Sequence, residues 1–473
     1  MFKRMLTLAL ITLLVFATQA CKEKGKKAKS VNKDNTDQTN QPAPPTDGTA
    51  ENGKTPSSDS AATASATATA PNAAQPAATP PEPTKAVSGP LRSDFGVDMA
   101  QKVITIGALN DESGPAAVIG KPYASGKRLL ARQVNAGGSG ILPDGWSVKL
   151  VEKDHGYNPQ KSVQAFNEIK DDVLFIGTSF GTPNTLPLRD ALTRDGLVAF
   201  PASLSSKMAE HTYTPPAGPS YEIEAMGAMD FIVQHAKDAA AVKAAVIYQQ
   251  DDYGLDGLKG FKRAAITHGV TIVAEQTVVP GQKDFVAVVS ALKNKGATHV
   301  LMVVLPSATG PILGTAAQMK YMPVWVGSTP TWIDPFFSPK VIPSVVFSRF
   351  YWMSSLPVWG EPVPGMKTFM AAFKTHGADL GRPDFYLLVS YLQGRIALEA
   401  ARSAIEMGDI SRKGYLKALQ ELSEWNADGM MQPVNLTTMP YVTGTKVRVL
   451  RPIFEKMTWT VASGYATPKT IDQ

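Results

Sequence analysis

Residues 103–109 read Val-Ile-Thr-Ile-Gly-Ala-Leu, and this run opens the part of the chain that has a folding pattern. It is short and almost continuously apolar, which is typical of a strand buried on both faces of a parallel sheet. Similar runs recur along the chain and alternate with amphipathic stretches. The further apolar runs are residues 148–151, 173–176, 197–200, 244–248, 270–273, 299–304 and 324–326.

The stretches between these runs predict helices, for example over residues 126–134 and 158–170. The second opens with Asn158-Pro159, an N-cap followed by proline at the first helical position. Residues 350–425 have a mainly helical pattern, and strand-like patterning returns at 446–454 and 458–461. Strands separated by helices predict an α/β fold with covered parallel sheets. The segment 102–473 is too long for one ordinary open sheet, so we expect two α/β lobes that face each other across a cleft.

Several short motifs follow one another in a recognisable order. They include Ser-Gly-Pro at 113–115, Val-Asn-Ala-Gly-Gly at 134–138, Asp-Asp-Tyr-Gly-Leu-Asp-Gly at 251–257 and Gly-Gln-Lys-Asp-Phe at 281–285. Over residues 102–465 this series resembles the branched-chain amino-acid (Leu/Ile/Val-type) substrate-binding proteins of ABC transporters. The resemblance implies the type I periplasmic-binding-protein fold, with two Rossmann-like lobes joined by a three-crossover hinge. Mapped onto this chain, lobe one is 102–221 and 351–435, and lobe two is 222–350 and 436–465.

The resemblance also implies where a ligand binds. Family members hold a ligand carboxylate with hydroxyl and backbone N–H groups of two loops, which are residues 180–183 and 201–205 here. Fixed donors of this kind suit a carboxylate because charge-assisted hydrogen bonds are strong. Tyr253 matches an aromatic position of the second lobe. The residues expected to bind the ligand are Thr182, Ala202, Ser203, Tyr253, Thr329 and Tyr123, each of which has loop or core packing as an alternative role.

The chain departs from the amino-acid binders at one position. Residues 327–330 read Gly-Ser-Thr-Pro, so Thr329 stands where those proteins place a glutamate against the ligand ammonium. A buried ammonium without a counter-charge is costly. We therefore expect a small carboxylate or a neutral organic ligand, and we expect Trp332 and Tyr123 either to line its pocket or to pack in the core.

The N-terminus predicts export. A basic start, an apolar run over residues 6–16 and a small residue before Cys21 are typical of a signal peptide, here residues 1–20. The resemblance of this segment to a lipobox implies that Cys21 carries a lipid anchor, although Thr18 replaces the preferred leucine. Residues 21–100 are Lys-rich and then rich in Pro, Ala and Thr, which predicts a disordered tether. The protein would then face the periplasm or the cell exterior.

The charge distribution argues against nucleic-acid binding. The formal net charge is +6, and residues 1–34 carry all of it, so the predicted lobes are neutral overall. The six histidines are scattered and form no metal-ligand pattern. We expect no metal and no cofactor, a monomer, and an ABC permease in the membrane as the partner.

Two other functions remain open on the sequence. A lipoprotein of this fold can act as a regulator or sensor that binds a membrane protein. Residues 177–181 read Gly-Thr-Ser-Phe-Gly, which fits the nucleophile motif of α/β hydrolases with Ser179 as nucleophile and His376 as a possible base. No oxyanion-hole segment precedes this motif, so we expect the chain not to be an enzyme.

Overall fold

The computed structural model describes residues 90–472, and all structural statements below concern these residues. The expected signal peptide, the expected lipidation site Cys21 and residues 21–89 of the expected tether lie outside the described residues. Residues 90–100 belong to the folded part, contrary to the tether boundary at residue 100. Val97–Asp98 pairs with the first long strand, and Arg92 forms a 2.9 Å ion pair with Asp409.

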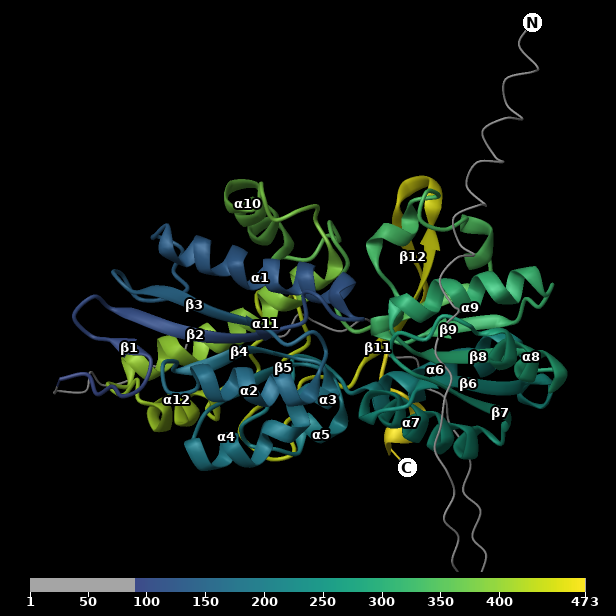
Figure 1. The fold of residues 1–473 in the computed structure, drawn as a ribbon, viewed down its shortest axis with the longest axis horizontal. Helices are drawn as coiled ribbons and strands as arrows, with labels where there is room; N and C mark the ends of the chain where they lie inside the picture. Colours follow the sequence, from purple (N-terminus) through teal and green to yellow (C-terminus); the bar gives the residue numbers. More distant parts are fainter. Residues whose placement is uncertain (1–89, 473) are drawn as a thin grey trace, which may run out of the picture. The chain divides into compact units, whose positions relative to one another are not determined.

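Strands and helices alternate along most of the described chain (Figure 1). The strands are β1 (Val97–Asp98), β2 (Val103–Asn110), β3 (Ser147–Asp154), β4 (Phe175–Phe180), β5 (Ala199–Ala202), β6 (Lys243–Gln249), β7 (Thr271–Val278), β8 (His299–Val303), β9 (Val324–Gly327), β10 (Phe350–Ser354), β11 (Val447–Ile453) and β12 (Thr458–Ala466). The helices are α1 (Ala117–Asn135), α2 (Pro159–Ile169), α3 (Thr182–Thr185), α4 (Arg189–Asp195), α5 (Ser206–Ala209), α6 (Tyr221–Ala236), α7 (Asp252–His268), α8 (Val286–Asn294), α9 (Pro306–Gln318), α10 (Met366–His376), α11 (Phe385–Glu406) and α12 (Arg412–Leu419).

The first lobe is built on a sheet in which β3, β2, β4 and β5 lie side by side and parallel. β1 adds to β2 in the antiparallel sense. The predicted cap of α2 is present, since the Asn158 side chain accepts a hydrogen bond from the Lys161 amide at 3.0 Å. α11, which is central to this lobe, packs against α1.

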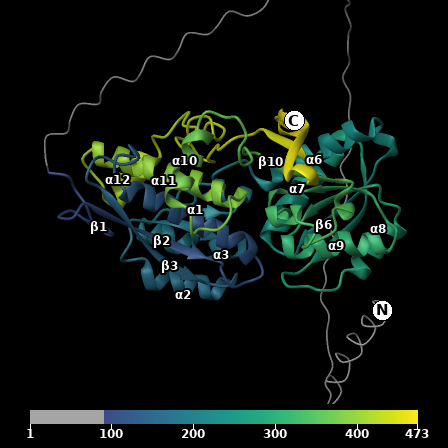
Figure 2. The same cartoon turned by 90° about the horizontal axis from the view of Figure 1, so that it is seen from above.

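The second lobe is built on a sheet with the order β12-β11-β10-β9-β8-β6-β7. Strands β6 to β10 are parallel, and β11 and β12 add to them as antiparallel strands. The expected α/β architecture with two sheet-based lobes is thereby confirmed, with antiparallel strands added to each parallel sheet (Figure 2). The central strands β2, β4, β6, β8 and β9 overlap apolar runs of the sequence, because parallel strands that are buried on both faces are apolar on both faces.

The chain passes between the lobes near residues 218–221, 354–356 and 443–447. These segments lie together, since the Thr443 hydroxyl donates to the Gly218 carbonyl at 2.8 Å and Arg448 donates to the Leu356 carbonyl at 2.9 Å. Two boundaries differ from the expected ones. β10 pairs with β9, which places residues 351–354 in the second lobe. Tyr441 donates from its amide to Ala209 and from its hydroxyl to Thr212, which places it in the first lobe.

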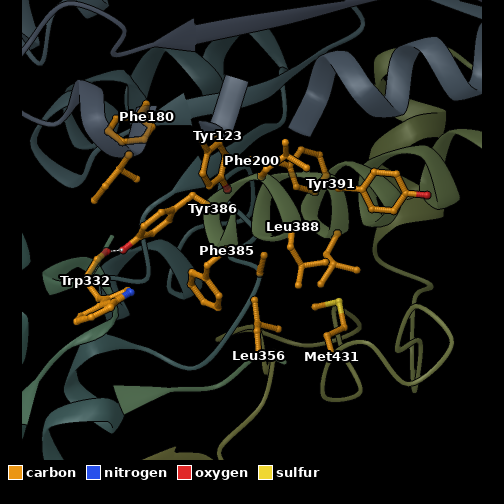
Figure 3. Packing of buried hydrophobic residues seen from close by; sticks show 14 of the residues in the cluster. Tyr123, Phe180, Phe200, Trp332, Leu356, Phe385, Tyr386, Leu388, Tyr391 and Met431 are labelled. Atoms are coloured by element: carbon orange, nitrogen blue, oxygen red, sulfur yellow. Dashed lines mark hydrogen bonds between the residues drawn. The ribbon is translucent and has the colours of Figure 1, made fainter. Parts of the chain in front are cut away.

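Aromatic and aliphatic side chains from α1, the strand ends, α11 and the second lobe form one buried cluster (Figure 3). Trp332 is fully buried in it and packs against other rings, with centroid distances of 4.9 Å to Phe337 and 4.6 Å to Trp459. Within residues 90–472, the helices are all too short or too polar to cross a lipid bilayer.

Candidate functional site

A cavity of about 650 Å³, part of it open to solvent, lies where the two lobes meet. The first lobe contributes residues of α1, α11 and the loops that follow β4 and β5. The second lobe contributes Tyr253 of α7, Leu305 after β8, and Thr329 with Pro330 after β9. These positions follow from the topology, because the carboxyl ends of parallel strands meet at one edge of each sheet.

All the residues that the sequence analysis singled out as ligand contacts line this one cavity. They are Tyr123, Thr182, Ala202, Ser203, Tyr253 and Thr329. Trp332 does not line the cavity, because its indole is enclosed by the aromatic cluster of the second lobe. Its expected alternative role in core packing is the one that the structure shows.

The loops after β4 and β5 bring two hydroxyl groups together. Thr182 Oγ1 and Ser203 Oγ lie 2.7 Å apart, and Ser203 Oγ also accepts from the Ser205 amide at 3.2 Å. Gly181 makes the turn before Thr182 with φ of 92°, a conformation that favours glycine. One hydroxyl hydrogen is used between the pair, so one remains free whichever residue donates. The pair therefore offers a hydrogen-bond donor to the cavity.

A buried polar network closes the wall beside this pair. Tyr123 donates from its hydroxyl to Gln393 Oε1 at 2.9 Å, and Gln393 Nε2 donates to the Pro201 carbonyl at 2.7 Å. Lys127, one helical turn after Tyr123, donates to the same Gln393 oxygen at 3.2 Å and to the Ser390 carbonyl at 3.0 Å. The network fixes the positions of Tyr123 and Gln393, both of which face the cavity.

Tyrosines supply much of the remaining wall. The Tyr253 hydroxyl lies 2.8 Å from Ser328 Oγ, and Tyr157 accepts from Gln249 Nε2 at 3.3 Å, which leaves the Tyr157 hydroxyl hydrogen available. Tyr386 of α11 reaches across to the second lobe, where its hydroxyl lies 2.9 Å from the Thr329 carbonyl oxygen and 2.8 Å from that of Trp332 (Figure 3). Burial raises the pKa of Tyr253 and Tyr386, so both remain protonated at neutral pH.

Thr329 lines the cavity, and its amide and hydroxyl groups are hydrogen-bonded to a residue outside the cavity wall. The buried carboxylate of Glu224 on α6 accepts from the Thr329 amide at 3.0 Å and from the Thr329 hydroxyl. Desolvation raises the pKa of Glu224 to about 7, while the hydrogen bonds from Thr329 oppose this rise. Glu224 does not line the cavity, and among the described lining residues none carries a formal charge. The wall thus presents hydroxyls, amides and apolar surface.

The sequence analysis missed several lining residues. Tyr157, Tyr386 and Gln393 come from helices or from a loop with no motif of their own, and only their place in the fold brings them to the cavity. Glu224 and its partner Thr329 are distant in sequence, so no local pattern links them. A buried carboxylate at the start of an apolar helix was the available signal, because such groups need a partner.

The hydrolase motif has a structural role. Ser179 is fully buried at the end of β4, and its hydroxyl lies 2.8 Å from the Thr185 hydroxyl. Thr185 in turn donates to the Ser179 and Gly181 carbonyls at 3.0 Å. Within residues 90–472, Ser179 has no histidine as a hydrogen-bond partner. No group of three or more His, Cys, Asp or Glu side chains in the described chain is placed to hold a metal ion.

Comparisons with known proteins agree with this geometry. A family model described as periplasmic binding protein matches residues 103–448. A Leu/Ile/Val-binding protein homolog from Brucella melitensis is 30% identical over 203 residues, which are 42% of this chain and 53% of that protein. The chain thus spans about half the length of this curated relative.

Solved structures show the same fold. A fatty acid ABC transporter substrate-binding protein from Thermomonospora curvata superposes with a TM-score of 0.74 at 20% identity, covering 81% of this chain and 96% of that one. A branched-chain amino acid ABC transporter protein from Thermus thermophilus, with bound valine, gives a TM-score of 0.69 at 18% identity, covering 78% and 98%. The family resemblance and the fold expected from the sequence are confirmed.

Proposed function

The chain belongs to the periplasmic binding protein family, and from this membership we propose that it is the solute-binding component of an ABC importer. It would bind one small organic ligand between its two lobes and present it to a permease in the membrane. The observation that carries the proposal is the cavity between the lobes, lined by the paired hydroxyls of Thr182 and Ser203 and by tyrosines. A mainly apolar pocket with a few fixed polar groups is the usual form of a small-molecule site.

The proposed ligand has an apolar body and an acid group. Rings and aliphatic side chains of the cavity would cover the body, while the free hydroxyl hydrogen of the Thr182–Ser203 pair would bind the acid. The relatives named above bind fatty acid or valine, which are both carboxylates. We propose that Thr182, Ala202, Ser203, Tyr253, Thr329 and Tyr123 contact the ligand.

We further propose that the ligand needs no α-amino group. The amino-acid binders of the resemblance use a glutamate for the ammonium, and Thr329 occupies that position here. Glu224 does not replace it, because both its carboxylate oxygens accept hydrogen bonds from Thr329 and it lies outside the cavity wall. An ammonium in this cavity would have no exposed carboxylate to pair with, which is costly.

The proposed setting is a membrane surface. Cys21 would carry a lipid anchor after removal of residues 1–20, and the Lys-rich start of the tether would favour anionic headgroups. The protein would act as an anchored monomer that faces the periplasm or the cell exterior. Metabolic labelling with a radioactive or alkyne-bearing fatty acid tests this, because Cys21→Ser should abolish the labelling of the full chain.

Ligand binding is tested by thermal shift and isothermal titration calorimetry on the full chain. The panel contains the twenty amino acids, straight-chain fatty acids, branched short-chain acids and aromatic acids. We expect micromolar or tighter binding of at least one acid without an α-amino group. Stereospecific binding of L-leucine or L-valine would contradict the proposed ligand class, and no binding by any member would contradict transport itself.

A further inference from the structure

Lys127 is a buried amine that has no acidic partner among residues 90–472. Its residue is 4% exposed, and its ammonium donates only to neutral oxygens, those of the Ser390 carbonyl and the Gln393 amide. Among residues 90–472, no carboxylate lies within ion-pair distance of it. A buried lysine in such surroundings is rare because the charged form loses its hydration without gaining a partner.

In the part of the chain that the structure describes, the surroundings of Lys127 offer no other charge. The space behind its side chain is bordered by apolar residues of β2, β3, β4 and α11, such as Ile106, Leu150 and Phe175. The titratable group that faces it is Tyr123, whose ring centroid lies 5.9 Å from the Lys127 ammonium. Burial lowers the pKa of Lys127 well below its usual value and raises that of Tyr123.

The lysine nevertheless lies directly behind the cavity wall. Both groups that separate it from the cavity, Tyr123 and Gln393, are lining residues and are hydrogen-bonded to each other. Gln393 also donates to the carbonyl of Pro201, two residues before Ser203. The Lys127 side chain and the Thr182–Ser203 hydroxyl pair therefore lie on the same side of the cavity, the side formed by the first lobe.

We propose that Lys127 is the counter-charge for the acid group of the ligand, acting through Gln393 and Tyr123, and that it makes the cavity select acids over uncharged molecules of the same shape. The inference rests on the proposed function and deepens it, since it names the charge that the ligand must carry. Lys127 is a positioning and selectivity residue in this account, because the wall keeps it from direct contact with the ligand.

Electrostatics sets the expected size of the effect. An acid group against the Tyr123 ring would lie about 6–9 Å from the Lys127 ammonium, and with an effective dielectric constant of about 20 the attraction to a charged Lys127 corresponds to roughly 20- to 100-fold in affinity. Where Lys127 is neutral in the empty protein, the cost of taking up the proton lowers this gain. The bound anion also raises the pKa of Lys127 above its value in the empty protein. Acid binding should therefore take up a proton whenever the pH lies between these two pKa values.

The test compares matched acid and amide pairs on the full chain: octanoate with octanamide, 4-methylpentanoate with 4-methylpentanamide, and phenylacetate with phenylacetamide. The wild-type protein should bind at least one acid at least 10-fold more tightly than its amide. Lys127→Met should lose most of that preference, so that the ratio of acid affinity to amide affinity falls toward one. Lys121→Met, an exposed position on the same helix, serves as the control and should retain the preference.

Two further measurements separate charge from mere packing. Calorimetry in buffers of different ionisation enthalpy should show proton uptake on acid binding by the wild-type protein and none by Lys127→Met. Gln393→Glu supplies an internal anion beside Lys127, so it should weaken acid binding at least 10-fold, and it carries the test if Lys127→Met does not fold. A folded Lys127→Met protein that keeps its acid preference overturns the inference alone. Failure of every acid and amide to bind wild-type protein overturns the proposed function and the inference with it.

Discussion

At the scale of single residues, what the cavity can bind depends on which hydroxyl and amide hydrogens of its wall are free to donate to a ligand. Thr182 and Ser203 share one hydrogen bond and leave one donor free, while Thr329 has both its donors committed to Glu224. The first-lobe hydroxyls can therefore bind an acid, whereas Thr329 can contribute only its side-chain surface and its oxygen as an acceptor. Substitutions at these positions should have effects of very different kinds.

Thr182→Val should weaken acid binding about 10-fold or more, because it removes a hydroxyl while keeping the shape of the side chain, and hydrogen bonds to charged groups contribute about 1.5–3 kcal/mol. Calorimetry measures the change. The matched control is Thr178→Val in β4, where the buried hydroxyl has no partner within the described residues and does not line the cavity. Equal loss of affinity in both variants would show that Thr182 acts through general packing.

Glu224→Gln should change how stability depends on pH. The pKa of Glu224 is about 4.5 in the unfolded chain and about 7 in the folded protein, so the folded state binds the extra proton between these values. Its contribution is fully present below about pH 4.5 and is lost as the pH rises through 7, by up to about 3 kcal/mol. Chemical denaturation from pH 4 to 8 should show that Glu224→Gln flattens this decline. The exposed Glu421→Gln serves as control, and an unchanged profile in Glu224→Gln would contradict the assignment.

At the scale of elements, the close contact of α1 with α11 positions the network behind the cavity. A β-carbon on Gly126 would lie 2.3 Å from the Leu387 carbonyl oxygen, and one on Gly394 would lie 2.4 Å from the Leu130 side chain. The two glycines allow the helices to approach until Lys127 reaches Ser390 and Gln393. A larger side chain at either position would move Tyr123 away from the cavity.

Gly126→Ala should therefore destabilise the protein by about 1–3 kcal/mol, since the clash involves a backbone atom that cannot rotate away. Gly314→Ala in α9 is the matched control, because a β-carbon there meets nothing within 4 Å and alanine favours a helix by about 1 kcal/mol. Urea denaturation of both variants measures the difference. If Gly126→Ala left the free energy of unfolding unchanged, α1 and α11 would be less tightly packed than described.

Prediction from sequence succeeded for features that depend only on the residues within one strand or one helix end. The buried strands were recognisable because each is apolar on both faces, and the α2 cap because Asn158 and Pro159 act locally. α1 begins at Ala117, nine residues before the predicted start, since Pro122 lies within it and masked its first turns. β10 was taken for part of a helical region because its aromatic residues fit either pattern. The pairs that form only through tertiary contacts, Gln393 with Tyr123 and Glu224 with Thr329, have no local signature in the sequence.

At the scale of the whole folded part, direct contacts hold the lobes together around the cavity. Near the crossovers, Ser206 donates from its amide to Asp256 at 3.0 Å and Lys207 pairs with Asp252 at 2.6 Å. From α11, the Phe385 amide donates to Asp334 at 3.2 Å and Tyr386 reaches the Thr329 and Trp332 carbonyls. These contacts join the two lobes directly, so an opening motion that separates α11 from the second lobe would break them.

Tyr386→Phe should shift the equilibrium toward the open form and weaken ligand binding about 2- to 10-fold, because the closed form loses a hydrogen bond between the lobes. Small-angle scattering with and without a bound acid should show a smaller closure than in the wild type at the same ligand concentration. Tyr391→Phe is the control on the same helix, since its hydroxyl binds Gln133 at 2.7 Å within the first lobe. Identical scattering of both variants would contradict the role of Tyr386 in closure.

The central claim is that the two lobes bind one small acid between them. Native mass spectrometry of the full chain, mixed with the acid panel, tests it most directly. The account predicts that each chain carries one molecule of an acid without an α-amino group. This adduct should be lost when both Thr182 and Ser203 are replaced by residues without a hydroxyl group. Absence of any stoichiometric adduct, or an adduct that survives this double substitution unchanged, would contradict it.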